Sequence, residues 1–285
     1  MFVGLATVDL IHRVEHPVAV NQKVTALSQE IVAGGPAANA AVTFALLGGE
    51  AVLITDLGRH PLAELARQDL VAFGVGVRPV EPDHPAVPAV SSIRVLDATG
   101  ERSVVSVNAA ARTVAAPGWL PDAMDGAAVL LLDGHHPFLA LAAARAARDR
   151  SVPVVLDAGS WKPVLTDLLP LVDIAICSAD FRLPGATDAV PGLLARGVRQ
   201  VVISRGGAPL LWWADGRAGE IPVPDVDVRD TLGAGDVLHG AFAWEHAMAR
   251  VDLAGQLALA ARIASRRCAF AGIDAWRRHL AAQNR

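Results

Sequence analysis

The sequence predicts an α/β protein in which a doubly wound, mostly parallel β-sheet is flanked by helices and carries a small β-sheet lid. Strand-length apolar runs alternate with helical patterns along most of the chain, and two β-prone stretches interrupt that alternation. In addition, 53% of the 285 residues are hydrophobic, which is enough for a large core. Because α/β folds of about 250 residues often form one unit, we expect residues 1–285 to form a single domain.

The predicted strands of the main sheet are continuous apolar runs. This pattern is typical of strands that are buried on both faces of a parallel sheet. The runs are Met1–Ala6, Ala51–Thr55, Ala127–Leu132, Val152–Leu156, Ile174–Cys177 and Val201–Ser204. Helical patterns lie between or after them, at Ala37–Leu47, Pro61–Phe73, Phe138–Asp149, Ala189–Arg196, Asp236–Arg250 and Leu253–Phe270.

The two interrupting stretches are residues 8–32 and 87–107, which are β-prone and lack helical spacing. In the second stretch, a turn at Asp97–Gly100 separates SSIRVL from RSVVSV, which is a hairpin signal. We therefore expect a small separate sheet beside the main one. Over the carboxyl edge of the main sheet, it would be placed to act as a lid.

Charge, apolar run length and cysteine content exclude several classes of protein. The net charge of −4 argues against nonspecific binding to nucleic acid, and no apolar run reaches the ~20 residues of a membrane span. Only two cysteines are present, Cys177 and Cys268, so no disulfide framework is expected. The start, MFVGLATVDL, has no basic region and no small-residue cleavage site. We expect a soluble, cytoplasmic protein.

The strongest motif is DTLGAGD at residues 230–236, which directly precedes a helical pattern. Glycines at a helix start let the backbone approach a ligand closely, and the unpaired N–H groups there attract anions. Gly233, Ala234 and Gly235 would form such an anion hole. A carboxylate beside it repels the ligand unless it accepts a proton during phosphoryl transfer, so Asp236 is a candidate base. The alternative is a glycine-rich turn whose aspartate is favoured by the helix dipole.

Two further features fit a ligand site. Gly34-Gly35-Pro36-Ala37-Ala38-Asn39 again opens a helical pattern, and Asn39 would hydrogen-bond a small polar ligand one turn into it. Asp9 follows the first predicted strand, at the sheet edge where open α/β sheets bind ligands. Each has a plainer interpretation, a structural turn with Pro at the helix start or a turn aspartate.

Together these features resemble the ribokinase-like, or PfkB, carbohydrate kinase family. GGPAAN is similar to its N-terminal signature and DTLGAGD to its C-terminal one, and the resemblance spans the whole chain. TVDLIHRVE and GDVLHGAFA look most like the ketohexokinase and sulfofructose kinase branch. The resemblance implies an ATP-dependent kinase for a small sugar, with Mg²⁺ as a cofactor and a homodimer formed through the lid.

The resemblance also implies a role for each matching residue. Asp236 would be the catalytic base, which we expect to be ionised at neutral pH because it lies at a helix N-terminus. Gly233, Ala234 and Gly235 would hold the transferred phosphoryl group. Sugar hydroxyls would contact Asp9, Gly34, Gly35 and Asn39, and we add Asn108 and His135 as substrate candidates. The nucleotide would contact Ser204, Gly206, Gly207, Thr231, Ala264, Cys268 and Gly272.

The chain departs from the family pattern at two places. Family members often carry Asn-x-x-Glu after the strand that here is Ile174–Cys177, and that motif helps to organise Mg²⁺; this chain reads CSADFRLPGA. No metal-ligating residue is therefore assigned, and the nucleotide phosphates and water would hold the ion. Leu232 replaces the usual second Thr of DTLGAGD, which weakens the case for a K⁺ site at Asp230.

The only two lysines suggest a substrate class. Lys23 falls on the predicted lid and Lys162 follows a strand, and an acceptor that carries phosphate or sulfonate needs cationic contacts. An anionic ketose is therefore one hypothesis. The alternative is that both lysines are ordinary surface residues. His239, one turn into the helix after Asp236, is interpreted as a packing residue.

Several other functions compete with this interpretation. The absence of GxxxxGK[ST] excludes a P-loop kinase, and the absence of GxGxxG after the first strand excludes a Rossmann dehydrogenase. A sugar- or nucleotide-binding regulator without catalysis remains an alternative, although Asp236 and its glycines argue against it. A nucleoside kinase of the same family is another, although the lid stretches contain no aromatic residue to cover a base.

Overall fold

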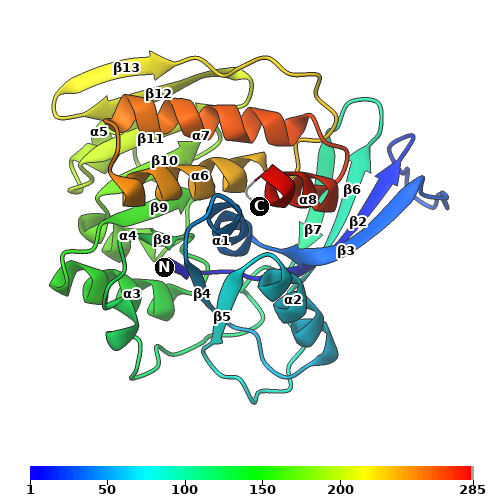
Figure 1. Ribbon diagram of the computed structural model, residues 1–285, viewed down its shortest axis with the longest axis horizontal. Helices are drawn as coiled ribbons and strands as arrows, with labels where there is room; N and C mark the ends of the chain where they lie inside the picture. Colours follow the sequence, from blue (N-terminus) through cyan, green and yellow to red (C-terminus); the bar gives the residue numbers. More distant parts are fainter. Residues whose placement is uncertain (284–285) are drawn as a thin grey trace.

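The computed structural model describes residues 1–283 and contains two β-sheets (Figure 1). The nine-stranded main sheet has the order β13 (Arg217–Ile221), β12 (Ala208–Ala214), β11 (Gln200–Arg205), β10 (Ile174–Ser178), β9 (Val154–Ala158), β8 (Leu130–Leu132), β1 (Phe2–Val3), β4 (Ala51–Thr55) and β5 (Val75–Pro79). All neighbouring pairs from β11 to β5 are parallel, and β12 and β13 add an antiparallel edge.

Helices cover both faces of the main sheet and define two hydrophobic clusters. One cluster packs under α1 (Pro36–Leu46), α2 (Pro61–Ala72), α6 (Ala234–Met248), α7 (Leu253–Cys268) and α8 (Ile273–Gln283). The other packs under α3 (Pro137–Asp149), α4 (Leu165–Leu168) and α5 (Ala189–Leu194), with short 3₁₀ turns η1 (Asp122–Met124) and η2 (Leu169–Leu171) nearby. The doubly wound fold expected from the alternating pattern is confirmed.

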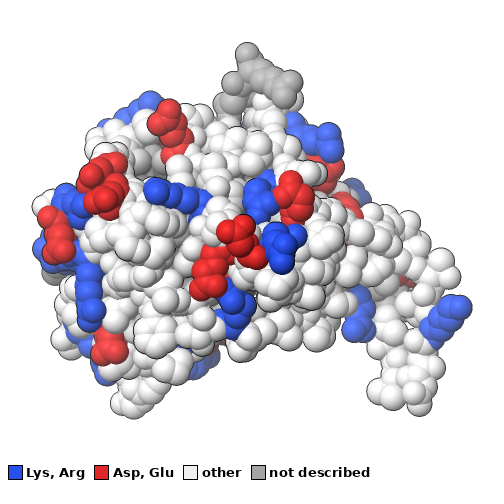
Figure 2. All heavy atoms as spheres, turned by 90° about the horizontal axis from the view of Figure 1, so that it is seen from below, with Lys and Arg blue, Asp and Glu red and all other residues white. Residues whose placement is uncertain are grey.

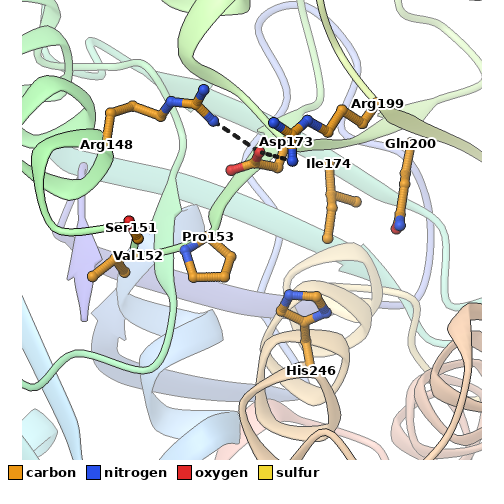
Figure 3. Close-up of a pocket in the computed structure, with 9 residues that line it drawn as sticks. All are labelled: Arg148, Ser151, Val152, Pro153, Asp173, Ile174, Arg199, Gln200 and His246. Carbon is orange, nitrogen blue, oxygen red and sulfur yellow. Dashed lines mark hydrogen bonds and ion pairs between the residues drawn. The ribbon is translucent and has the colours of Figure 1, made fainter.

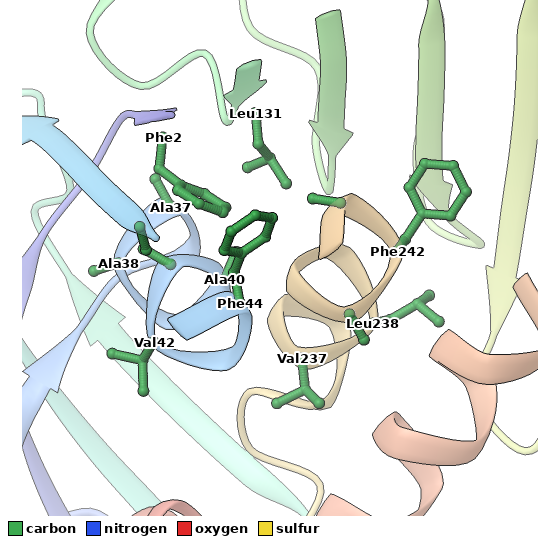
Figure 4. Close-up of a cluster of buried hydrophobic side chains, with 14 of the residues drawn as sticks. Phe2, Ala37, Ala38, Ala40, Val42, Phe44, Leu131, Val237, Leu238 and Phe242 are labelled. Carbon is green, nitrogen blue, oxygen red and sulfur yellow. The ribbon is translucent and has the colours of Figure 1, made fainter. Parts of the chain in front are cut away.

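Helices α1 and α6 pack closely side by side, and this contact brings their N-termini together. A Cβ atom on Gly240 would collide with the backbone carbonyl of Ala40, so glycine is what allows the approach. Figure 4 shows the apolar side chains beneath the two helices, where Phe2 and Phe44 meet edge to face with centroids 5.3 Å apart. The packing thereby fixes the relative position of residues in the first turns of both helices.

The small sheet has the order β3 (Ser28–Gly34), β2 (Thr7–Val14), β6 (Val90–Leu96) and β7 (Arg102–Ser106). β2 is antiparallel to β3 and parallel to β6, and β7 is antiparallel to β6. The chain passes from the end of β1 at Val3 to the start of β2 at Thr7, so this sheet adjoins the carboxyl edge of the main sheet. Its inner face packs through Ile11, Val32, Ile93 and Val95 against Leu232 and Ile273.

Five elements were not expected from the sequence: β5, β12, β13, α4 and α8. β5, β13 and α8 have partly exposed faces and α4 is a single turn, so none of these shows a long apolar run. β12 is a continuous apolar run, APLLWWA, that was not assigned as a strand. The predicted strand Val152–Leu156 is also displaced, because β9 runs from Val154 to Ala158. This shift places Asp157 inside the strand, near its carboxyl end.

The surface has no obvious region of one charge on the face shown in Figure 2, where acidic and basic side chains are interspersed. Among residues 1–283, no helix is both long and apolar enough to cross a membrane.

Candidate active site

The first turns of α1 and α6 meet in a direct side-chain contact. The amide of Asn39, in α1, donates from Nδ2 to Oδ2 of Asp236, in α6, over 2.7 Å. The two signature motifs of the sequence are therefore adjacent in space. Gly233 lies beside the pair, since a Cβ atom there would stand 3.9 Å from Oδ2 of Asp236 and 4.0 Å from Nδ2 of Asn39.

Helix α6 begins in a way that leaves amides available for an anion. Gly233 caps it in the left-handed conformation, with φ of 73°, which glycine adopts without steric cost. The amide of Ala234 donates to the carbonyl of Thr231 at 3.3 Å, whereas those of Gly235 and Asp236 have no acceptor in the described part of the chain. Open amides at a helix start favour a bound phosphate.

The carboxylate of Asp236 differs from our expectation that it stays ionised at neutral pH. Burial and the nearby negative charge of Asp157 raise its pKa to about 7, and the hydrogen bond from Asn39 only partly offsets them. The helix dipole does not keep this carboxylate ionised, because desolvation and the second carboxylate outweigh it. An aspartate that titrates near neutrality is better suited to accept a proton than an ordinary one.

Two residues beside Asp236, Asp157 and His239, were not predicted to take part in the site. Asp157 is buried near the end of β9, where its Oδ1 accepts from the amide of Gly159 at 3.1 Å. His239 has Nδ1 2.7 Å from the carbonyl oxygen of Gly235 and 3.4 Å from Oδ2 of Asp157. His239 therefore links the first turn of α6 to the carboxylate that perturbs Asp236. The sequence signal for Asp157 was an acidic residue at the end of an apolar run, which the misplaced strand boundary obscured.

Asp9 lies in β2 of the small sheet rather than at the end of a main-sheet strand. The hydroxyl of Thr7 donates to its Oδ1 over 2.6 Å, and burial raises the pKa of the carboxyl group. Gly34 stands directly against it, because a Cβ atom at position 34 would collide with the carboxylate. The structure thus brings Asp9 together with the Gly34–Gly35 turn that precedes Asn39.

Asp133 organises the backbone around this site. It follows β8 and accepts from the amides of Leu5 at 2.8 Å, Ala37 at 3.2 Å and His135 at 3.0 Å. It therefore fixes the exit of β1 and the start of α1. Burial lowers the pKa of His135, which favours the neutral imidazole at pH 7. Lys162 lies next to this turn, because its Cδ would be 3.5 Å from a Cβ atom on Gly134.

The residues assigned to the nucleotide lie in three segments of the chain. Ser204, Gly206 and Gly207 lie at the end of β11 and in the turn after it. Ala264, Cys268 and Gly272 belong to α7 and the loop after it, and the carbonyl of Cys268 accepts from the amides of Arg229 at 2.7 Å and Asp230 at 3.2 Å. Thr231 donates to the carbonyl of Gly100 at 3.1 Å and accepts from Arg102 of β7 at 3.2 Å. The DTLGAGD loop is thereby tied to the small sheet.

The surroundings of Asp230 do not fit a K⁺ site. Its carboxylate is fully buried and forms ion pairs, each of 3.3 Å, with Arg267 of α7 and Arg13 of β2. It also accepts from the amides of Leu232 at 2.8 Å and Gly272 at 3.1 Å. Two guanidinium groups thus supply the positive charge that a bound cation would provide.

Two predicted substrate residues are exposed beside the small sheet, Asn108 near the end that carries Asp9 and Lys23 near the other end. Lys23 is exposed in the connection between β2 and β3, beyond the strand end at which Arg13 faces Ser28, whereas Asp9 lies near the other end. Asn108 is exposed after β7, in the left-handed conformation with φ of 49°. Their roles stay predictions.

A separate pocket of about 420 Å³ lies at the opposite edge of the main sheet (Figure 3). Pro153, Asp173 and Gln200, at the amino ends of β9, β10 and β11, help to line it. Arg148 and Arg199 both turn toward Asp173 there, at 3.0 Å and 3.7 Å, so one carboxylate is shared between two guanidinium groups. It is therefore distinct from the site around Asp236.

The doubly wound fold and a site with open helix amides beside a titratable carboxylate define a phosphotransferase. A family model described as pfkB family carbohydrate kinase matches residues 1–270, and the chain belongs to this family. The resemblance drawn from the two signature motifs is thus confirmed.

Individual relatives agree with this assignment. The chain is 27% identical over 264 residues to a ribokinase of Arabidopsis thaliana, covering 85% of the chain and 68% of that protein. It is 32% identical over 245 residues to an aminoimidazole riboside kinase of Salmonella typhimurium, covering 75% of the chain and 76% of that protein. A crystal structure of a putative ribokinase from Agrobacterium tumefaciens superposes with a TM-score of 0.85 and 26% identity, covering 99% of this chain and 95% of that one. The structure of Arabidopsis thaliana ribokinase complexed with ribose and ATP gives a TM-score of 0.80 at 23% identity, covering 98% of this chain and 96% of that one, and supports the fold.

Proposed function

We propose that this protein transfers the γ-phosphoryl group of ATP to a hydroxyl group of a small sugar. The observation that carries the proposal is the Asp236 carboxylate, whose pKa of about 7 and contact with Asn39 place a titratable base beside the open amides of α6. A binding protein has no need of such a base. For this reason we prefer an active kinase to a regulator that has lost catalysis.

In this proposal each group around α6 has one task. Oδ2 of Asp236 is held by Asn39, so Oδ1 is the atom that accepts the hydrogen bond and then the proton of the attacking hydroxyl. Of the predicted anion hole, the amides of Gly233 and Gly235 would receive the phosphoryl oxygens as charge shifts during transfer, together with that of Asp236, whereas the amide of Ala234 already donates to Thr231. Asp9, Gly34, Gly35 and Asn39 would hold the other sugar hydroxyls, with His135 and Asn108 as further candidates.

The site offers a partial ligand set for Mg²⁺. No group of three or more His, Cys, Asp or Glu side chains among residues 1–283 is arranged to hold a metal ion. Asp157 and Asp236 nevertheless repel each other strongly, which a cation would relieve. Asp157 is therefore the residue that would help the ATP phosphates and water hold the ion. When bound, Mg²⁺ would neutralise charge on the phosphates.

We assign ATP to the side of α6 formed by β11 and α7. Ser204, Gly206, Gly207 and Thr231 would face its phosphates and ribose, and Ala264, Cys268 and Gly272 its adenine. Arg102 is added to this set because it donates to Thr231 and its charge lowers the pKa of Asp236. The buried ion pairs of Asp230 lead us to propose that activity requires no K⁺.

The acceptor is a neutral or anionic small sugar, with a ketose of the ketohexokinase and sulfofructose kinase type as the finer hypothesis. An anionic group would be bound through Lys162, beside His135, rather than through the exposed Lys23. A nucleoside is the second candidate, favoured by the 32% identity to an aminoimidazole riboside kinase. The small sheet supplies no aromatic residue to cover a base, which supports a plain sugar.

We further propose that the small sheet is a lid and a dimer surface, with the protein acting in the cytoplasm, where ATP is available. A lid that closes over the acceptor would exclude water, which otherwise competes for the phosphoryl group. Contacts of Arg102 and Gly100 with Thr231 already couple the small sheet to the DTLGAGD loop.

The test separates catalysis from binding. Asp236→Asn keeps the size and hydrogen-bonding capacity of the side chain but removes the base, so kcat should fall by roughly 10²–10⁴-fold. Calorimetric affinities for ATP and the sugar should stay within about threefold, because backbone amides and other side chains make those contacts. Near-normal turnover in this variant would contradict the assignment of the base.

A further inference from the structure

Arg277, on α8, is buried and bridges three segments that approach the site. Only 2% of its surface is exposed. Nη1 donates to Oδ2 of Asp69 at 2.9 Å, and Nη2 donates to the carbonyl of Ala33 at 2.8 Å and to Oδ1 of Asn39 at 2.9 Å. Asn39 in turn donates to Asp236. A continuous chain of hydrogen bonds therefore runs from α8 to the candidate base.

The chemistry of the guanidinium group determines how the Asn39 amide faces. An arginine donates hydrogen bonds and accepts none, so the side of Asn39 that meets Arg277 must be its oxygen. The NH₂ group then necessarily faces Asp236. With this amide turned over, its oxygen would face the carboxylate and repel it. Arg277 thus selects the orientation that binds Oδ2 of Asp236 and leaves Oδ1 for a substrate.

Packing alone does not explain this residue. Removing a guanidinium from water costs several kcal/mol, and an apolar side chain of similar volume often serves a core as well. Arg277 nevertheless occupies the interior with one carboxylate partner, Asp69, and lies 5.4 Å from the ring centroid of Phe73. It also lies beyond residues 1–270, the part of the chain that the family model matches.

We propose that Arg277 is a positioning residue that orients the Asn39 amide toward Asp236 and ties the Gly34–Gly35 turn to α8. The bond to Ala33 fixes the backbone immediately before that turn, and Asp69 anchors the guanidinium from the far side by also accepting from the amide of Ala33 at 2.8 Å. This proposal rests on the function proposed above for Asp236.

The test is a double-mutant cycle with a matched control. Arg277→Met should lower kcat by about tenfold in the wild-type background and by less than about twofold in an Asn39→Ala background, because the effect passes through Asn39. KM for ATP should change little. Arg278→Met is the control, since Arg278 is the next residue of α8, is exposed and, among residues 1–283, pairs with Asp274. It should leave kcat unchanged.

A second readout needs no turnover. The pKa of Asp236, followed by NMR of labelled aspartate carboxyl groups, should rise in Arg277→Met, because the amide hydrogen bond that lowers it is lost. The other groups facing Asp236 are Asp157 of β9, His239 of α6 and Arg102 of β7, and all remain. Arg277→Met also removes a positive charge. The control for that effect is Arg277→Met in the Asn39→Ala background, where the pKa of Asp236 should hardly move. Should Arg277→Met not fold, Asp69→Asn loosens the same guanidinium and should raise this pKa in the same direction.

The outcomes distinguish the two proposals. If the wild-type protein phosphorylates no acceptor, the proposed function fails, while the NMR cycle still reports on Arg277. If the kcat and pKa effects of Arg277→Met are the same with and without Asn39, Arg277 acts only on stability, and its positioning role is contradicted.

Discussion

Asp236 is a carboxylate that the fold makes hard to ionise. Burial and Asp157 raise its pKa to about 7, while Asn39, His239 and Arg102 act in the opposite direction. A base whose pKa matches the working pH combines an adequate ionised fraction with enough driving force to take a proton. Because the group must be ionised to act, its pKa governs how activity depends on pH.

We expect the carboxyl group of Asp236 to titrate near pH 7 in the metal-free protein. In Asp157→Asn its pKa should be lower, because removing the neighbouring negative charge makes Asp236 easier to ionise. The measurement is NMR of labelled aspartate carboxyl groups in both proteins without Mg²⁺. A pKa near 4 in the wild type, or one that Asp157→Asn leaves unchanged, would contradict this cause of the shift.

The raised pKa of Asp236 also affects how the stability of the fold depends on pH. Because the folded-state pKa lies above the ordinary value of an aspartate, the folded protein binds this proton more tightly than the unfolded chain does. Between about pH 4 and 7 the contribution of Asp236 to the free energy of unfolding therefore falls as pH rises. Asp236→Asn carries no such penalty and should have a higher Tm than wild type at pH 8, with the advantage shrinking toward pH 4. A lower Tm at pH 8 would contradict this.

At the scale of elements, helix α6 is open at its N-terminus, where we propose that phosphate binds, and crowded at Gly240, where it packs against α1. A Cβ atom on Gly235 meets nothing within 4 Å, whereas one on Gly240 collides with the carbonyl of Ala40 in α1. Two glycines five residues apart on one helix therefore serve different purposes.

Paired substitutions test this difference. Gly235→Ala should keep or slightly raise Tm, because alanine favours the helix, yet lower kcat/KM for ATP at least about tenfold, because the methyl group stands where phosphate approaches. Gly240→Ala should cost about 1–3 kcal/mol of stability through overpacking between α1 and α6. The measurements are thermal melts and steady-state kinetics of both variants. Identical losses of Tm would contradict the different roles of Gly235 and Gly240.

The DTLGAGD loop is held by charges from two other elements. Arg267 of α7 and Arg13 of β2 neutralise the buried Asp230, so K⁺ has no charge left to balance. We expect replacement of KCl by choline chloride at constant ionic strength to change kcat less than about twofold, since no cation is displaced. A rate that collapses without K⁺ and returns on its addition would show that a cation site exists despite the two arginines.

The sequence predicted most of the strands that are continuous apolar runs. It also predicted the features that are contained within one short motif. GGPAAN and DTLGAGD predicted two helix starts and a shared site, and Asn39 and Asp236 do meet. The perturbation of Asp236 by Asp157 was not predictable, because it depends on a contact between distant segments. Arg277 was missed because the helical pattern was followed only to Phe270, and because an arginine in a polar helix gives no sign that it is buried.

At the scale of the whole molecule, the small sheet is packed on one face and exposed on the other. Its inner face contacts Leu232 in the DTLGAGD loop, whereas in its outer face Ile31 of β3 lies beside Leu10, Ser92 and Val105 in register. Ile31 is 45% exposed and Val105 64%. Exposed apolar side chains on a sheet face are suited to contact with a second copy of the chain.

We expect light scattering to give the mass of a dimer at micromolar concentration. Ile31→Glu and Val105→Glu should shift the protein toward monomer while retaining the fold, because the charges would be buried only in the dimer. A wild-type monomer at all concentrations, or a dimer unaffected by either substitution, would contradict the dimer surface.

The central claim is phosphoryl transfer from ATP to a small polyhydroxylated acceptor. The most direct measurement incubates the protein with Mg²⁺ and ATP and, one at a time, with pentoses, ketohexoses, phosphosugars, sulfosugars and nucleosides, following ADP release and the product by ³¹P NMR. The account predicts that a sugar of this panel stimulates ADP release and yields a stoichiometric phosphate ester. Tight binding of ATP and sugar with no ADP above the acceptor-free rate across the whole panel would contradict it and would favour a binding protein.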